Sequence, residues 1–297
     1  MQRSPLLERL IARASTPARV ADWRAEAFRV IAPEEGVMPP IAATALNAGT
    51  AAGAWVCIAT AVHFSAGMSN VTMPADGIVE LDNAEAETLA TDFNRVFAGA
   101  GMRLRVSRGA VLLCVFDQRL EVTTHDPEAA GGHDVFDFQP AGADAPRLRR
   151  LMSEMEMWLF DHEVNRARAA HARQVITGLW LWGGGATGST RPTVHGWTAG
   201  QDVFFAAFGQ EARFPSEAGA GVVACVDQPG SSAWPAVEQR WLAPALTALK
   251  SGRIAGLDLS AGNWRFSLRR APNWRFWRRP RPWWESFGMI DESDGIQ

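Results

Sequence analysis

The chain has 297 residues, of which 47% are hydrophobic and 21% are charged, and its formal net charge is −3. This composition is ordinary for a globular protein. No uninterrupted apolar run reaches the roughly 18 residues of a membrane span, and the charged, amphipathic segment 1–10 lacks the apolar stretch of a secretory signal. We therefore expect a cytoplasmic protein without a transmembrane segment.

Cysteine usage agrees with a reducing compartment. Cys57, Cys114 and Cys225 are odd in number, and each lies inside an apolar run. Neither a disulfide framework nor a zinc site has this pattern, so we expect buried, reduced thiols. A catalytic thiol is the alternative, but nothing nearby in sequence would depress its pKa.

Positive charge is concentrated near the C-terminal end. Lys250 is the only lysine, and seven arginines fall in the acid-free stretch 264–284, where aromatic residues alternate with them. Arginine with aromatic side chains suits single-stranded nucleic acid, an anionic membrane surface or an acidic protein partner. The alternative is a last strand and a tail packed against the acidic body. The candidate partner-binding residues are Arg275, Trp277, Arg278, Arg279, Trp283 and Trp284.

Residues 1–50 have the pattern of helices. Leu6, Leu7, Leu10 and Ile11 form a helical stripe, and Thr16-Pro17 is a suitable cap and first turn for a second helix. Pro39-Pro40 predicts the start of a short alanine-rich helix that ends near Gly49.

The pattern changes at Trp55, where strands and helices begin to alternate. We predict strands at 54–62, 103–106 and 111–116, a helix after Asp82 or Asn83, a loop of roughly twenty residues at 126–145, a helix from Pro146, and an apolar strand at 175–182. The final third predicts strands at 203–208, 222–226, 254–259 and 264–268, and a helix over 234–249. We therefore expect an α/β (α+β) fold, a mixed sheet with flanking helices.

A glycine-rich run follows the strand at 175–182. Gly183-x-Gly185-x-x-Gly188 matches the dinucleotide-binding fingerprint, but the segment after it, Ser189–Val194, is poor helix material. A helix N-terminus must hold the pyrophosphate in that motif. A tight exit from the strand is therefore the better interpretation.

Two His-Asp dipeptides form the densest group of potential metal ligands, His125-Asp126 and His133-Asp134. Imidazole with carboxylate suits a divalent transition metal. The spacing matches no zinc signature, and Asp126 is also a suitable helix cap. Both interpretations stay open.

Asn165, Arg166 and Arg168 could bind a phosphate or carboxylate, because guanidinium presents paired donors. They could equally pair with Glu163 or lie on a solvated helix face. We find no Gly-x-Ser-x-Gly elbow, His-Glu-x-x-His, P-loop or Cys-x-x-Cys motif, and therefore assign no catalytic residue.

One segment resembles a known family. His162-Glu163-Val164-Asn165-Arg166-Ala167-Arg168, followed by Trp180-Leu181-Trp182-Gly183-Gly184-Gly185, resembles the archaeal-type cofactor-independent phosphoglycerate mutases of the alkaline phosphatase superfamily. In that family, His-Pro-Val-Asn-x-x-Arg leads into a strand ending Trp-x-Trp-Gly-x-Gly, at the end of a domain inserted into a phosphatase-like core. Residues 125–126 match a His-Asp pair of the family, and 55–64 resemble the start of the insertion. The likeness covers 50–185 and is closest to the bacterial branch often called phosphoglycerate mutase or regulatory protein.

The resemblance implies a phosphorylated serine and two divalent metals held by Asp and His ligands outside the insertion. The family's Asp-x-x-Gly-His corresponds to Asp227-Gln228-Pro229-Gly230-Ser231, and its later Asp-His corresponds to Asp258-Leu259, both without the histidine. The helical pattern of residues 1–50 also replaces the strand that supplies the family's first Asp. The two-metal clamp then cannot assemble. Glu163 also stands where proline is usual.

The residue patterns predict a helical segment at 1–50 and an Arg/Trp-rich tail at 271–297, and the resemblance implies a mutase-insert-like α/β domain at 51–185 and a degenerate phosphatase-core-like region at 186–270. Our main hypothesis is a non-catalytic relative of these mutases, a pseudoenzyme that binds or regulates and needs no cofactor. It would bind a small phosphorylated or acidic ligand, with the candidate residues His125, Asp126, Asn165, Arg166, Arg168, Trp182, Gly183 and Gly185.

Two alternatives remain. An active mutase or phosphatase would use Mn²⁺ or Mg²⁺, with His125, Asp126, His133 and Asp134 as candidate ligands. An adaptor would bind a protein, nucleic acid or membrane partner through the tail.

Overall fold

A computed structural model describes residues 3–45, 53–187, 192–200, 202–209, 213–216, 221–225, 234–261, 264–270, 278–283 and 285. The chain divides into two compact units, one of Pro39–Arg191 and one that combines Met1–Met38 with Pro192–Gln297. In chain order the first unit therefore interrupts the second. Across the described ranges, no helix is long and apolar enough to span a membrane.

The unit Pro39–Arg191 is built on a four-stranded sheet in the order β5-β6-β2-β7. Its strands are β2 (Trp55–Val62), β5 (Met102–Val106), β6 (Leu112–Phe116) and β7 (Gly178–Ala186). All three strand pairs of this sheet are antiparallel. The strands at 54–62, 103–106 and 111–116 were thus predicted correctly.

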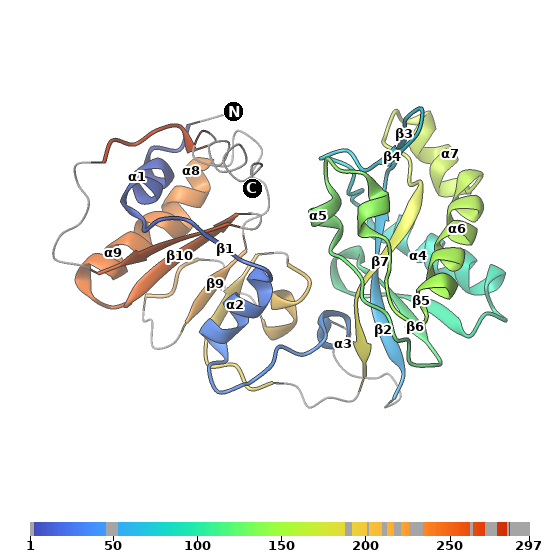
Figure 1. Cartoon of the computed structure of the whole chain (residues 1–297), viewed down its shortest axis with the longest axis horizontal. Coiled ribbons are helices and arrows are strands. Elements are labelled where there is room, and N and C mark those ends of the chain that lie inside the picture. The colour runs from blue at the N-terminus through green and yellow to red at the C-terminus, as the bar shows by residue number, and fades with distance from the viewer. Residues whose placement is uncertain are drawn as a thin grey trace, which may run out of the picture. The chain divides into compact units, whose positions relative to one another are not determined.

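Helices cover this sheet. They are α3 (Ile41–Ala45), α4 (Asn83–Val96), α5 (Pro127–Ala130), α6 (Ala145–Phe160) and α7 (Glu163–Ala170), with 3₁₀ turns η1 (Arg108–Ala110) and η2 (Val135–Phe138) and a small hairpin of β3 (Ser65–Ala66) and β4 (Val71–Thr72). Figure 1 shows α6 and α7 on one side of β2 and β7, and α5 on the other. The segment predicted as a loop at 126–145 therefore contains two short helical turns.

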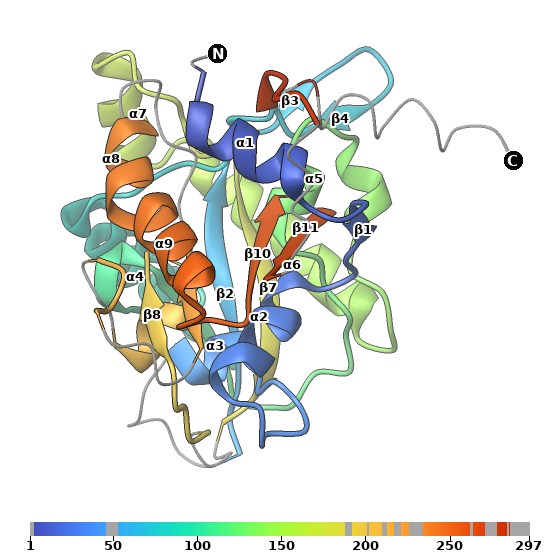
Figure 2. The same ribbon diagram turned by 90° about the vertical axis from the view of Figure 1, so that its left-hand side faces the viewer.

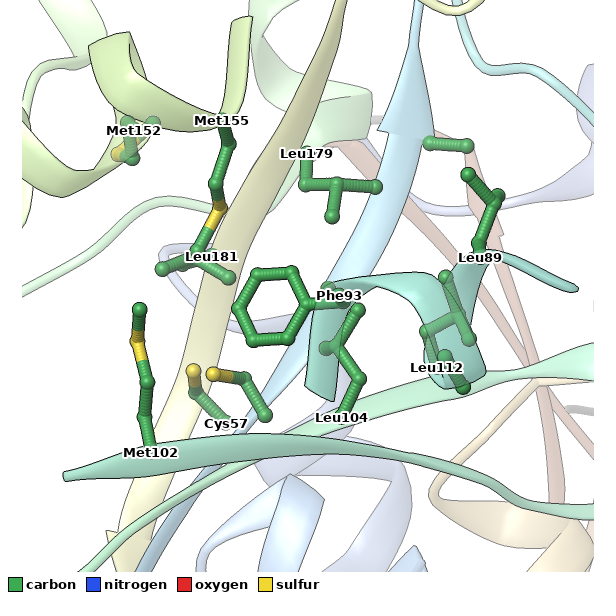
Figure 3. Close-up of a cluster of buried hydrophobic side chains, with 14 of the residues drawn as sticks. Cys57, Leu89, Phe93, Met102, Leu104, Leu112, Met152, Met155, Leu179 and Leu181 are labelled. Atoms are coloured by element: carbon green, nitrogen blue, oxygen red, sulfur yellow. The ribbon is translucent and has the colours of Figure 1, made fainter. Parts of the chain in front are cut away.

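The core of this unit lies between the sheet and the helices α4 and α6. Phe93 of α4 is fully buried at its centre, surrounded by Leu104, Met155 and Leu181 (Figure 3). Asp82 and Glu85 form a capping box at the start of α4, which explains why this helix begins where the sequence predicted.

The other unit contains a three-stranded sheet in the order β1-β11-β10, antiparallel throughout. Its elements are α1 (Pro5–Arg13), β1 (Ala18–Arg19), α2 (Trp23–Ile31), β8 (Trp197–Ala199), η3 (Phe205–Phe208), β9 (Val222–Ala224), α8 (Trp234–Val237), a π-helical turn η4 (Glu238–Leu242), α9 (Ala243–Ser251), β10 (Gly256–Ala261) and β11 (Trp264–Arg269). Helices α1 and α9 cover β10 and β11 (Figure 2), and Leu10, Leu249 and Phe266 meet between them.

Two sequence predictions in this unit are wrong. Thr16-Pro17 does not start a helix, because Ala18 and Arg19 pair with β11 and the helix begins after Asp22, whose carboxylate accepts from the Ala25 amide. The apolar residues at 205–208 form the 3₁₀ turn η3 instead of a strand, because the Asp202 carboxylate accepts from the Phe204 and Phe205 amides and bends the chain there.

The predicted α/β (α+β) class is confirmed. Within the described strands, the one parallel pair joins β8 and β9, where Thr198 stands opposite Val223. We predicted a mixed sheet. The four-stranded sheet is antiparallel throughout, and the parallel pair of β8 and β9 forms a separate small sheet.

Candidate functional site

The His-Asp dipeptides lie around the short helical turns α5 and η2. Asp126 accepts from the Glu128 amide at 2.9 Å and begins α5, and Asp134 accepts from the Phe136 amide at 2.9 Å and begins η2. Both carboxylates therefore hold backbone amides at helical starts, which is the capping role that the sequence left open for Asp126.

The two imidazoles share one neighbour. The ring of His125 lies 5.8 Å from that of Phe138, and the ring of His133 lies 6.0 Å from it. The His125 carbonyl also accepts from the indole Nε1 of Trp180 at 2.7 Å, which fixes the backbone at this point against β7. Within the described ranges, no group of three or more His, Cys, Asp or Glu side chains is arranged to hold a metal ion.

The motif that carries the family resemblance begins at the start of α7. His162 is the N-cap, and its Nδ1 accepts from the Val164 amide at 3.2 Å. Its Nε2 lies 3.4 Å from an oxygen of Asp92 but makes no hydrogen bond. Burial lowers the pKa of His162, although Asp92 opposes this shift. A neutral ring with its proton on Nε2 follows from the capping contact.

The side chain of Asn165 makes three hydrogen bonds to two backbone segments. Its Nδ2 donates to the Leu159 carbonyl at 2.8 Å and to the Ile176 carbonyl at 2.7 Å, and its Oδ1 accepts from the Ile176 amide at 2.8 Å. The side chain is buried. Both ends of the amide are used within the chain, and Asn165 ties the end of α6 to the segment leading into β7.

Arg168 lies on α7 one turn after Asn165 and is also buried. Its Nη1 donates to Glu85 Oε2 at 2.7 Å, and its Nε donates to the Gln174 carbonyl at 2.6 Å. Arg173 contacts the same Glu85 carboxylate at 3.1 Å. Arg166, in contrast, is exposed and lies 3.6 Å from the equally exposed Asp161. The structure therefore brings Asn165 and Arg168 into the protein interior and leaves Arg166 at the surface.

Glu85 is the partner that sequence reasoning missed. Its position three residues after Asp82 was a detectable signal, because this spacing is that of a capping box. Glu85 fills that role and also pairs with Arg168, so the first turn of α4 is joined to the last turn of α7.

The glycine run lies inside β7, so the predicted strand exit at Gly183 is wrong. Val56 pairs with Gly185 and Ile58 pairs with Trp182, which leaves Gly183 and Gly184 opposite the single residue Cys57. This is a β-bulge, and Gly183 has a positive φ of +64°, a left-handed conformation that favours glycine.

Close packing explains the other two glycines. A Cβ on Gly184 would lie 2.2 Å from Cζ2 of Trp55, and one on Gly185 would lie 2.2 Å from Cβ of Pro40. Trp182 is buried on the same strand and donates from Nε1 to Thr60 Oγ1 at 2.8 Å. Trp182, Gly183 and Gly185 therefore have structural roles in the sheet, and Gly188 lies outside the described residues.

The positions that depart from the family pattern are partly described. Asp258 accepts from Ser267 and, through both oxygens, from Arg269 at 2.9 and 3.2 Å. Leu259 packs against the core of its unit. The segment 227–231 lies outside the described residues.

Three of the tail candidates are described. Arg278 and Arg279 are exposed, and Trp283 is half-buried with its ring 5.5 Å from that of Trp234. Arg275, Trp277 and Trp284 lie outside the described residues.

Comparisons with known proteins give little further information. No family model matches the chain, and no curated protein matches it. The solved structures that are similar include the cofactor-independent phosphoglycerate mutase from Thermoplasma acidophilum DSM 1728, at 12% identity and a TM-score of 0.39, over 93% of this chain and 84% of that one. A likeness of this strength supports no argument about activity.

Proposed function

We propose that this chain is a non-catalytic relative of the archaeal-type cofactor-independent phosphoglycerate mutases that acts in the cytoplasm by binding or regulation. The resemblance at His162–Arg168 and Trp180–Gly185 is the starting point. The interruption of one compact unit by another, at Pro39–Arg191, supports an insertion within a second domain.

The observation that carries this proposal concerns Asp258 and Leu259. The resemblance implies an Asp-His pair here, in which both side chains would bind metal. Instead, Asp258 pairs with Arg269 at the surface of the neighbouring strand, and the partly buried Leu259 packs against an apolar core. A leucine offers no ligand atom, so the pair lacks its histidine ligand. A two-metal phosphoryl-transfer site of this family needs both the aspartate and the histidine as metal ligands.

The motif residues support the same conclusion. His162, Asn165 and Arg168 contact backbone groups and Glu85 of their own unit. These contacts stabilise the unit. We therefore expect that other side chains form the ligand-binding surface of this protein.

Equilibrium dialysis of the full chain against Mn²⁺ tests the proposal. We expect no saturable uptake of two equivalents, because the ligand set is incomplete. Tight uptake of two Mn²⁺ per chain would overturn the proposal.

A metal-dependent phosphotransfer enzyme is a second candidate, favoured by the packing of both His125 and His133 against Phe138. It predicts that His125→Ala and His133→Ala each abolish Mn²⁺ uptake. Wild-type protein that takes up no Mn²⁺ would exclude this candidate.

An adaptor function is a third candidate, favoured by the exposure of Arg278 and Arg279. It predicts binding to single-stranded nucleic acid that weakens steeply with salt and is lost on changing both arginines to glutamate. Binding that is insensitive to salt would exclude it.

A further inference from the structure

A cavity of about 260 Å³ opens in the unit Pro39–Arg191 beside the first turns of α6. Its floor is apolar and consists of Met102 on β5, Phe116 on β6, Leu120, and Leu148 and Leu151 on α6. Each of these residues is at most 9% exposed, and most belong to the hydrophobic core. Because the core fixes these side chains, the floor of the cavity is preformed.

The rim of this cavity is charged. Arg147 and Arg150 are exposed and lie one turn apart on α6, so they share one face of the helix. Glu154 also lines the cavity, and its carboxylate pairs with Arg150 at 2.9 Å, so the rim has two positive charges and one negative charge. Arg147 donates to the Gln118 side chain at 3.5 Å, a long and weak hydrogen bond. Neither contact holds its guanidinium firmly, because exposed pairs of this kind contribute little.

The placement of these arginines is electrostatically unfavourable for the helix alone. Arg147 lies in the first turn of α6, which contains no acidic residue, and Arg149 and Arg150 follow in the second turn. The positive end of the helix dipole disfavours cations there. Asp144 stands at the N-cap, but its side chain makes no capping bond and instead accepts from the Glu121 amide at 2.8 Å. An anion bound at this rim would offset the excess positive charge.

We propose that this cavity binds a small amphipathic organic anion. Arg147 and Arg150 would hold the carboxylate or phosphate-ester head group, since guanidinium matches the geometry of both. The apolar body would contact Met102 and Leu151, the floor residues with the largest exposed fractions, at 6% and 9%. The site shares no residue with the metal-site positions on which the proposed function depends, so either proposal can fail without the other.

Fluorine NMR of the full chain with 4-(trifluoromethyl)benzoate tests this site. We expect saturable binding that inorganic phosphate weakens, and no saturable binding of the neutral 4-(trifluoromethyl)benzyl alcohol at the same concentrations. The 4-(trifluoromethyl)phenyl phosphate ester distinguishes the two head groups by its relative affinity. No saturable binding of either anion up to about 5 mM, or equal binding of the alcohol, would overturn the proposal.

Variants on one helix locate the site. Arg147→Gln and Arg150→Gln should each weaken binding of the anion about fivefold or more. Arg149→Gln is the matched control, because Arg149 donates to the Pro140 carbonyl at 2.8 Å and does not line the cavity. It should change the affinity less than about twofold. Equal losses in all three variants would show a diffuse charge effect and overturn the site.

Ala100→Trp gives an independent steric test. Ala100 is exposed and lines the cavity, so a large side chain there should obstruct it without disturbing the core. Circular dichroism would verify that each variant is folded. We expect binding to be lost in Ala100→Trp, and undiminished binding by the folded variant would contradict the proposed location.

Discussion

The guanidinium of Arg168 meets the carboxylate of Glu85 across 2.7 Å, and both side chains are nearly buried, at 5% and 12% exposed. This ion pair joins the first turn of α4 to α7, and it includes a residue that the sequence marked as a candidate for ligand binding. An arginine fixed in this way by its own fold stabilises that fold. Its contribution to stability is therefore measurable without any ligand.

Arg168→Gln should lower the free energy of unfolding by about 3 kcal/mol, because it leaves Glu85 without its most buried partner. Arg166→Gln is the matched control on the same helix, and it should change stability by less than about 0.5 kcal/mol because Arg166 is exposed. Urea unfolding of the three proteins measures both values. Similar stabilities for the two variants would contradict the structural role of Arg168.

We predict that the stability of the protein depends on pH through the titration of His162. Burial lowers its folded-state pKa below the ordinary 6.5, so the unfolded chain binds the proton more readily. Stability should therefore be full above pH 6.5 and fall as the pH drops through 6.5 towards the lowered pKa. His162→Asn keeps a capping side chain but removes the titration. Urea unfolding between about pH 7.5 and 5.5 should show a smaller loss in this variant than in the wild type. Equal losses would refute the assignment.

Gly184→Ala should destabilise the protein by about 2–3 kcal/mol, since the new methyl group would collide with the buried ring of Trp55. Gly99→Ala serves as the control, because nothing lies within 4 Å of a Cβ there. Thermal unfolding compares the two. A Gly184→Ala protein as stable as Gly99→Ala would mean that the bulge tolerates a side chain.

The cysteines should differ in reactivity towards a thiol reagent. Cys57 and Cys114 are completely buried and stand opposite each other on β2 and β6, while Cys225 is half-buried. Burial raises the pKa of the Cys57 thiol, which lowers the concentration of its reactive thiolate. We expect one thiol to react quickly in the folded protein and three in denaturant. Rapid reaction of all three without denaturant would contradict the burial of this pair.

Local signals predicted much of the fold. Asp82, a suitable helix cap, located the start of α4, and alternating or continuous apolar runs located β2, β5 and β6. The error at 205–208 came from the local contacts of the Asp202 carboxylate, whereas two others came from distant contacts. Pairing with β11 makes Ala18 and Arg19 extended, and the β-bulge opposite Cys57 carries β7 through its glycines. A local pattern contains no information about either partner strand.

The candidate site was harder to predict for the same reason. Asn165 bonds to backbone groups of Leu159 and Ile176, six and eleven residues away, and Arg168 pairs with Glu85 across 83 positions. An amide or guanidinium side chain can form the same hydrogen bonds with a ligand or with the protein backbone. Only the folded arrangement distinguishes the two, and in this protein both side chains contact their own chain.

The most direct test of the non-catalytic assignment is turnover of phosphoglycerate by the purified full chain in the presence of Mn²⁺. An active archaeal-type mutase under the same conditions serves as the positive control. We expect no interconversion of 2- and 3-phosphoglycerate above the background without protein, because Leu259 supplies no metal ligand. Turnover that depends on Mn²⁺ and scales with protein concentration would contradict this assignment.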